Sequence, residues 1–233
     1  MNNRTVDEEH INRTTDEEHA LSADMYFGPN YFAWDQLVSL SQQLIEVHNS
    51  GGKEVLEIGK GNGFVSDFLR KAGMNVTTFD INPNLNPDVV GDVLELERHF
   101  SENSFDTVLC AEVLEHMPFE NFRPTLKQIA KVCRSSCVLT LPRLQRILID
   151  WQMRIKIPKM EYKTMGLFLA AGAPLKNMYA GHHWEICSSK ETEIGELRAI
   201  IREHFEIEED YRLRWKAYHQ FFVLKALNSK SED

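Results

Sequence analysis

The sequence has no long hydrophobic run. Apolar residues nowhere approach the roughly 20 in a row that a membrane-spanning helix needs, and the polar start contains no apolar stretch of the kind found in a secretion signal. We therefore expect a cytoplasmic protein. Cysteine is also scarce, and Cys110, Cys133, Cys137 and Cys187 follow no zinc-ligand spacing. We expect reduced thiols, with no disulfide and no metal.

Positive charge is in short supply as well. The 233 residues carry 26 Lys and Arg against 35 Asp and Glu, a formal net charge of -9. Such a surface is a poor partner for a nucleic-acid backbone, so nucleic acid is not the expected substrate. With 42% hydrophobic residues, the chain suits one globular domain with a modest addition.

A glycine-dense turn follows the first predicted strand. The run from Val55 to Ile58 reads as a buried strand, and Gly59, Gly61 and Gly63 come directly after it. Glycine lets the backbone adopt left-handed conformations and approach a ligand closely. The stretch therefore predicts a loop that binds a nucleotide-like cofactor, although an ordinary strand-to-helix turn would leave a similar pattern.

Polar residues close three further predicted strands. A β-branched strand ends at Asp80, a short strand precedes Asp92, and a third runs from Phe105 to Cys110 just before Glu112. In an open parallel sheet the carboxyl ends of the strands share one edge, and ligands bind in the crevice there. An acidic residue one strand-helix unit after the glycines is placed to take both hydroxyls of a ribose.

This ordered set resembles the class I S-adenosylmethionine-dependent methyltransferases, of the small-molecule type 11 kind, over roughly residues 53–141. Its glycine spacing differs from the Gly-x-Gly-x-x-Gly of nicotinamide enzymes, which argues against a dehydrogenase. The resemblance implies a Rossmann-like α/β fold, with a seven-stranded mixed sheet and helices on both faces. It also implies S-adenosyl-L-methionine as cofactor and S-adenosyl-L-homocysteine as product.

The resemblance further assigns residues to that cofactor. The implied contacts are Glu57, Gly59, Gly61 and Gly63 for the methionine moiety, Asp80 for the ribose, Asp92 and Val93 for the adenine, Ala111 and Glu112 for the amino-acid end, and Ile81 and His116 beside the cofactor. Lys60 departs from the small residue common at its position, and its side chain either folds outward or reaches the cofactor carboxylate. Of Glu112 and Glu115 we expect one to face the site, and Glu115 to cap backbone groups instead.

About forty residues separate the fifth predicted strand, 137–141, from Gly181. Pro142 fits the start of a helix, and apolar residues then recur at helical spacing at Leu144, Ile147, Leu148, Trp151 and Ile155. We therefore expect an inserted helical cap that reads the substrate.

The cap is basic within an acidic protein. Its only acidic residues are Asp150 and Glu161, against seven cations: Arg143, Arg146, Arg154, Lys156, Lys159, Lys163 and Lys176. A local positive field favours an anionic acceptor, such as a phosphorylated sugar, a nucleotide-linked sugar or an acidic glycan. A solvated helix face that complements the acidic body explains the same charges equally well. The apolar run 165–171 would also suit a membrane surface or a lipid-linked substrate.

The cap returns to the core through Gly181, His182 and His183. Many small-molecule members of the resembled family have a Gly-His step at this point, which places the stretch over the transferred methyl group. A neutral imidazole can take the proton of an alcohol acceptor, so His182 or His183 is the candidate catalytic base. Either residue would otherwise simply hydrogen-bond the cap to the core. Trp184 stands where Arg is more usual.

We expect an enzyme that methylates an oxygen atom of a small, anionic acceptor. An RNA or protein methyltransferase and a non-catalytic S-adenosylmethionine-binding partner protein are the alternatives, and the oligomeric state is left open. Two strands, 205–213 and 218–227, should form a terminal antiparallel hairpin. The expected parts are a polar tail 1–24, an aromatic-rich helical lid 25–50, the cofactor core 51–141, the cap 142–181, the rest of the core 182–227 and a tail 228–233.

Overall fold

A computed structural model describes residues 22–144, 147–156, 162–170, 178–179 and 181–227. The strands are β1 Glu54–Ile58, β2 Asn75–Asp80, β3 Val89–Val90, β4 Phe105–Ala111, β5 Cys133–Pro142, β6 Ile147–Lys156, β7 Tyr162–Ala170, β8 Phe205–Arg212 and β9 His219–Ala226. The α-helices are α2 Trp34–Asn49, α3 Phe64–Lys71, α4 Phe122–Val132 and α5 Ile194–Arg202. Short 3-10 turns are η2 Ala23–Phe27, η3 Pro29–Phe32, η4 Pro83–Leu85, η5 Val93–Arg98, η6 Leu114–His116 and η7 Phe119–Asn121.

Seven strands form one mixed sheet in the order β3-β2-β1-β4-β5-β9-β8. Pairing is parallel from β3 to β5 and antiparallel from β5 through β9 to β8. The run Val55 to Ile58 is almost fully buried because β1 lies between two neighbours and under helices on both faces. The predicted seven-stranded fold and its terminal hairpin are confirmed.

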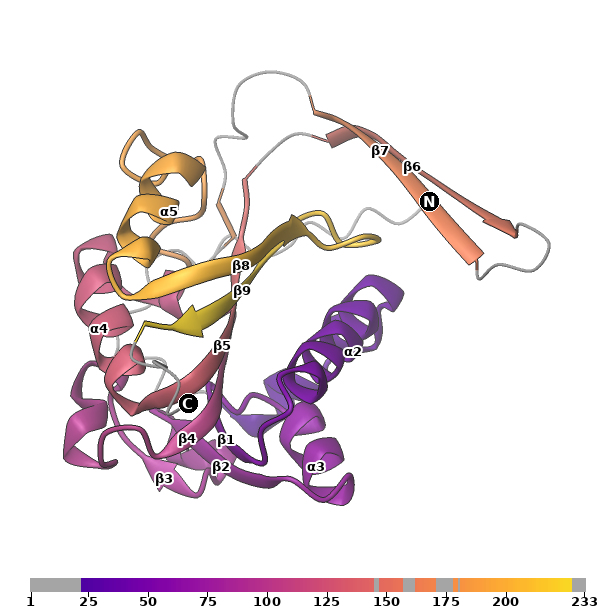
Figure 1. The fold of residues 1–233 in the computed structure, drawn as a ribbon. Helices are drawn as coiled ribbons and strands as arrows, with labels where there is room; N and C mark the ends of the chain where they lie inside the picture. The colour runs from indigo at the N-terminus through magenta and orange to yellow at the C-terminus, as the bar shows by residue number, and fades with distance from the viewer. Residues whose placement is uncertain (1–21, 145–146, 157–161, 171–177, 180, 228–233) are drawn as a thin grey trace, which may run out of the picture.

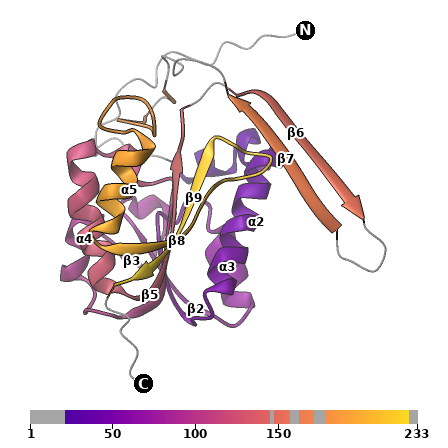
Figure 2. The ribbon, with the colours of Figure 1, turned by 45° about the horizontal axis from the view of Figure 1, so that its top comes forward.

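Helices cover the two faces of the sheet in pairs. Helices α2 and α3 lie on one face and α4 and α5 on the other (Figures 1 and 2). Each helix buries an apolar stripe spaced three or four residues apart, such as Val65 and Leu69 in α3 or Leu126 and Ile129 in α4. All four cysteines are buried free thiols, as predicted, and no helix of the described residues is long and apolar enough to cross a membrane.

The helical cap was predicted wrongly. Residues 147–156 and 162–170 pair as the antiparallel strands β6 and β7, which make a separate two-stranded sheet. From Ile149 to Lys156 apolar and polar residues alternate strictly, with Ile149, Trp151, Met153 and Ile155 as the apolar ones, and this period of two is the pattern of a strand. Pro142 ends β5, where it pairs with His219, and starts no helix.

The aromatic lid begins later than predicted. Helix α2 starts at Trp34 and not near Met25, because Gly28 and Pro29 break the chain into two 3-10 turns before it. It ends at Asn49, close to the predicted Gly51. The predicted tails lie outside the described residues. For most of the basic cap residues the structure does not describe the side chain. The predicted division into parts therefore stays a prediction.

Candidate functional site

The glycine loop lies between β1 and α3 at the carboxyl edge of the sheet. Gly59, Gly61 and Gly63 have φ angles of 81°, 52° and 74°, in the left-handed region that glycine tolerates best. A Cβ on Gly59 would lie 2.3 Å from Cγ2 of Val113, so the loop after β4 packs directly on the backbone here. The two loops that the resemblance assigns to the cofactor are therefore in contact.

Asp80 joins the end of β2 to the glycine loop. Its Oδ2 accepts a hydrogen bond from the backbone N–H of Lys60 at 2.8 Å, and its Oδ1 accepts one from Asn82 at 2.8 Å. Burial raises the pKa of the Asp80 carboxyl, and these backbone donors oppose that rise. The carboxylate is thus held at the predicted place, beside the loop and next to half-buried Ile81.

Lys60 turns away from the glycine loop. Its Nζ donates to the carbonyl oxygens of Leu85 at 2.8 Å and Asn86 at 2.7 Å, at the end of η4. Of the two orientations left open by the sequence, this is the outward one. The lysine ties the loop after β1 to the loop after β2, which helps to fix the position of Asp80.

Glu57 is a buried acid under the glycine loop. Its side chain is 4% exposed, and its Oε2 has no hydrogen-bond partner among the described residues. Burial raises the pKa of Glu57 to about 7, against the lowering effect of a hydrogen bond with Ser66 and of the cations Arg70 and Lys60. An unpaired buried carboxyl oxygen next to three left-handed glycines fits a cationic ligand group, so these residues fit the cofactor that the resemblance implies.

Asp92 begins η5 just after β3. Its Oδ1 accepts from the backbone N–H of Leu94 at 2.9 Å and so caps this short helix. The Val93 side chain is buried in the core, which leaves only its backbone for a ligand. Both residues lie at the predicted edge.

The end of β4 brings Ala111 and Glu112 to the same edge. Glu112 has a φ of 53°, an uncommon conformation for a residue with a side chain. Its Oε1 accepts from the Thr140 hydroxyl at 2.9 Å, and its Oε2 lies 3.4 Å from Nε2 of His219. Burial raises the pKa of Glu112 to about 8, and burial also lowers the pKa of His219 well below its usual value.

Glu115, His116 and His182 meet beyond Glu112. The two imidazole rings are 4.9 Å apart and edge-on, and Nδ1 of His116 lies 3.2 Å from the carbonyl oxygen of Gly181. Glu115 is fully buried, and neither carboxyl oxygen has a hydrogen-bond partner among the described residues. Among the described residues it therefore caps no backbone group of another residue. Burial first, and then the nearby Glu112, hold its pKa well above the usual value.

Glu185 organises His182. Its Oε1 receives hydrogen bonds from Nδ1 of His182 at 2.9 Å, the Tyr218 hydroxyl at 2.5 Å and the backbone N–H of Tyr179 at 2.8 Å. Although burial raises the pKa of Glu185, these donors lower it below the usual value. An ionised carboxylate only accepts, so Nδ1 of His182 is the donor, and Nε2 has a lone pair whenever the ring is neutral.

The two adjacent histidines are in different environments. The side chain of His182 is 7% exposed, whereas His183 is exposed and its backbone N–H donates to the Glu115 carbonyl at 2.8 Å. The geometry therefore favours His182 as a base. Ligand atoms of Glu115, His116 and His182 all lie within 4.8 Å of one another, a spacing that also suits a cation. The absence of a metal stays a prediction.

Sequence reasoning missed the roles of Glu185, Tyr218 and Trp184. Glu185 follows His182 by three residues, and that spacing was the available signal, but the approach of Tyr218 from the chain end depends on tertiary structure. Trp184 is a packing residue: its Nε1 donates to the Met117 carbonyl at 3.1 Å, and its ring packs edge-on against Phe119 and Phe122.

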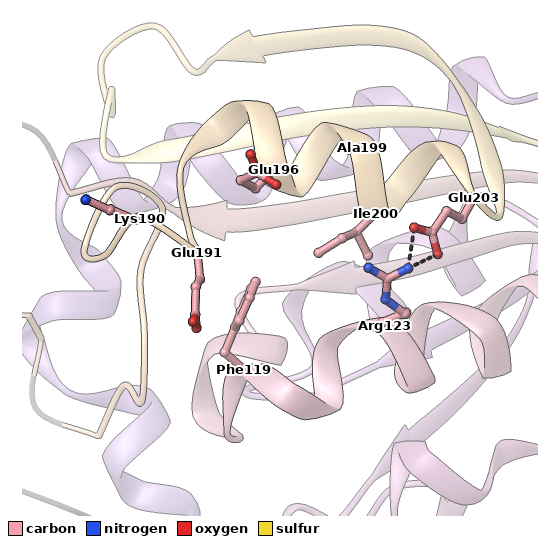
Figure 3. Close-up of a pocket in the computed structure, with 8 residues that line it drawn as sticks. All are labelled: Phe119, Arg123, Lys190, Glu191, Glu196, Ala199, Ile200 and Glu203. Carbon is pink, nitrogen blue, oxygen red and sulfur yellow. Dashed lines mark hydrogen bonds and ion pairs between the residues drawn. The ribbon is translucent and has the colours of Figure 1, made fainter.

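A surface pocket lies elsewhere, between α4 and α5. Phe119 and Ile200 form part of its lining, and an ion pair between Arg123 and Glu203 spans the two helices (Figure 3). It contains none of the predicted site residues. The chemistry at the carboxyl edge is therefore separate from this pocket.

Part of this chain is similar in sequence to known methyltransferases. Residues 56–141 match the family model of a methyltransferase domain. The ubiquinone biosynthesis O-methyltransferase of Erwinia tasmaniensis is 29% identical over 126 residues, which cover 48% of this chain and 51% of that protein. The protein of the same description from Xanthomonas euvesicatoria is 35% identical over 80 residues, 29% of this chain and 34% of that protein. The chain thus spans about half or less of the length of these curated relatives.

Solved structures share the fold at low identity. The magnesium protoporphyrin IX methyltransferase of Synechocystis with S-adenosylhomocysteine bound has a TM-score of 0.54 at 15% identity, covering 87% of this chain and 92% of that one. A glycopeptide N-methyltransferase with the same molecule bound has a TM-score of 0.53 at 12% identity, covering 80% and 89%. Residues 56–141 of this chain therefore match a methyltransferase domain, and the chain shares the fold of methyltransferases solved with S-adenosylhomocysteine bound.

Proposed function

We propose that the protein binds S-adenosylmethionine at the carboxyl edge of β1, β2 and β4 and transfers its methyl group to an oxygen atom of a small acceptor. The observation that carries this proposal is the buried pair of His182 and Glu185, 2.9 Å apart, held against the loop after β4. That loop also packs on Gly59 of the glycine loop. A base and a cofactor cradle thus share one edge, and the relatives named O-methyltransferases support oxygen as the acceptor atom.

The cofactor-binding part of the proposal uses residues with matching chemistry. Glu57 offers an unpaired buried oxygen to a cationic group, and the three glycines let that group approach the backbone. Backbone N–H groups, among them those of Lys60 and Asn82 at 2.8 Å, hold Asp80 beside the glycine loop, where its carboxylate would accept the ribose hydroxyls. Asp92 and the Val93 backbone would face the adenine, and Ala111, Glu112, Ile81 and His116 would line the remaining contact.

The bound cofactor supplies an activated methyl group on a sulfonium. The protein must hold the acceptor oxygen in line with that methyl group and exclude water. Nε2 of His182 would take the hydroxyl proton, and Glu185 would stabilise the imidazolium that forms. Tyr218 and the Tyr179 backbone hold the carboxylate in place, so proton transfer needs no rearrangement of Glu185.

The class of acceptor is a further part of the proposal. An anionic sugar or glycan was expected from the basic segment 142–181, and that expectation stays a prediction. Glu185, whose pKa is lowered, lies 2.9 Å from Nδ1 of the base, so an anionic group of the acceptor would have to point away from it, toward the basic segment. A neutral hydroxyl would face the base.

The first experiment is a calorimetric titration of the purified protein with S-adenosylmethionine and S-adenosylhomocysteine. We expect one-to-one binding of both. A methyl-transfer screen over anionic sugars and other small hydroxyl compounds then identifies the acceptor. Absence of binding by folded protein would refute the cofactor assignment, and binding without turnover on any acceptor would favour a non-catalytic partner protein.

A matched pair of variants tests the base. His182→Ala should lower kcat by about 10² to 10⁴ while leaving the affinity for S-adenosylhomocysteine unchanged. His183→Ala changes the same residue type one position away, on an exposed side chain, and should leave kcat near wild type. Equal effects of the two variants would contradict the assignment of His182.

A further inference from the structure

The hairpin of β6 and β7, residues 147–170, is here called the arm. Its two strands pair with each other, and among the described residues they make at most marginal contact with other helices and strands. Figures 1 and 2 show it projecting from the body beyond α2. Strand β6 has 10 residues, which at about 3.3 Å per residue extends the arm by roughly 30 Å.

One face of β6 is apolar and open to solvent. Trp151, Met153 and Ile155 are 48%, 36% and 38% exposed, and their spacing of two residues puts them on the same face of β6. In the register of the hairpin, Trp151 pairs with Leu167 and Met153 with Met165. The sequence thus supplies large apolar residues to both strands at these positions. An isolated two-stranded ribbon is marginally stable in water, so such a face calls for a partner.

The segment that carries the arm is the basic part of an acidic chain. Residues 142–181 contain seven Lys and Arg against two acidic residues, whereas the whole chain has a net charge of -9. Along the sequence, Arg146 precedes the arm, Arg154 and Lys156 belong to β6, Lys159 follows β6, and Lys163 belongs to β7. An anionic partner would therefore be attracted to the arm and repelled by the rest of the protein.

Two exposed tryptophans belong to segments of the body near the point where the arm leaves it. The Arg143 N–H donates to the Tyr218 carbonyl at 2.7 Å, and Lys216 of the same turn contacts the start of α2 through Gln36 at 2.6 Å. Trp34 and Trp215, in these two neighbouring segments, are 71% and 54% exposed. The root of the arm and the candidate site are also close, because Tyr218 bonds Glu185.

We propose that the arm docks on an anionic lipid surface, with Trp151, Met153 and Ile155 inserted at the interface and the flanking cations against the headgroups. Tryptophan favours the boundary between lipid headgroups and acyl chains. A basic, amphipathic element binds anionic bilayers through burial of its apolar residues and through attraction of its cations to the headgroups. Two arms fit each other less well, since both carry the same excess of cations. An arm against the acidic body of a second copy is a dimer, which the test below detects. The proposal does not depend on methyl transfer.

The test is sedimentation of the full chain with vesicles of phosphatidylcholine alone or with about 30% phosphatidylglycerol. The test variant replaces Trp151, Met153 and Ile155 with serine. The control variant replaces Ile45, Phe68 and Leu227 with serine, which are 49%, 56% and 51% exposed and lie outside the arm. Circular dichroism and affinity for S-adenosylhomocysteine are measured on all three proteins, which tests fold and proposed function separately.

Wild type and control should bind the anionic vesicles at least about tenfold better than the neutral ones, with weaker binding at high salt. The arm variant should lose at least about tenfold of that binding. A second measurement uses brominated lipids: they should quench wild-type fluorescence, and Trp151→Phe should remove most of that quenching. Equal binding of arm variant and control, no vesicle binding by wild type, or a dimer that the arm variant dissociates would each overturn the proposal.

Discussion

At the residue scale, the pair of His182 and Glu185 is the centre of the candidate chemistry. Oε1 of Glu185 accepts hydrogen bonds from Nδ1 of His182, the Tyr218 hydroxyl and the Tyr179 backbone N–H. This arrangement fixes both the ring orientation and the protonated nitrogen of His182. Glu185 is thus a positioning residue for the proposed base.

Glu185→Gln should lower kcat by about 10- to 100-fold, because an amide cannot stabilise the imidazolium as a carboxylate does. The affinity for S-adenosylhomocysteine should be unchanged. Tyr218→Phe removes one donor and keeps the carboxylate, so it should cost less. A kcat of Glu185→Gln near wild type would contradict this role.

The buried Glu57 should make cofactor affinity depend on pH. Its pKa is raised to about 7 by burial, so the free protein holds a proton there at pH 6 and has largely released it at pH 8. A cationic cofactor group favours the ionised carboxyl, and binding at low pH must first expel the proton. Affinity for S-adenosylmethionine should therefore rise by about tenfold from pH 6 to pH 8. Calorimetry on Glu57→Gln should show a flatter profile, and a parallel profile would disprove the linkage.

At the scale of elements, the close packing of two loops sets the geometry of the edge. Gly59 has a φ of 81°, and a Cβ there would meet Val113 at 2.3 Å. The contact places the loop after β4, with Glu112, Glu115 and His116, against the loop after β1. Local backbone conformation and long-range packing both require glycine at this position.

Gly59→Ala should lower the free energy of unfolding by about 2–4 kcal/mol, from the left-handed φ and the clash together. Gly73→Ala is a matched control, because its φ is 89° and a Cβ added there would have nothing within 4 Å. It should cost only the backbone term, about 1–2 kcal/mol. Denaturant unfolding measures both variants. Equal losses of unfolding free energy in the two variants would mean that the Val113 side chain can move away from the added Cβ without destabilising the protein.

At the scale of the whole molecule, the body and the arm are separate packing units. The sheet and its four covering helices bury two apolar clusters, one on each face, whereas the arm makes at most marginal contact with them among the described residues. The body should therefore fold without the arm.

Replacing residues 147–170 with a short Gly-Ser turn should change the free energy of unfolding of the body by less than about 1 kcal/mol, because few buried contacts are lost. The affinity for S-adenosylhomocysteine should also be retained. Chemical denaturation and calorimetry on the shortened chain give both values. A loss of several kcal/mol would show that the arm supports the body.

Much of the body follows from local sequence. The buried run at β1, the glycines after it and the acids at Asp80 and Asp92 predicted the sheet and its cofactor edge, because each signal lies within a few residues and matches one backbone period. The outward direction of Lys60 could not be predicted, since its acceptors Leu85 and Asn86 lie about one strand-helix unit away.

The arm and the base network required the fold itself. Residues 147–155 fit a helical and an alternating apolar pattern at once, so pairing with β7 chose between them. Glu185, Tyr218 and Glu115 come from distant parts of the chain, and their burial together changes the pKa of each carboxyl. Periodicity and glycine placement are local properties that a sequence carries directly, whereas protonation and the choice between His182 and His183 depend on which groups the fold buries side by side.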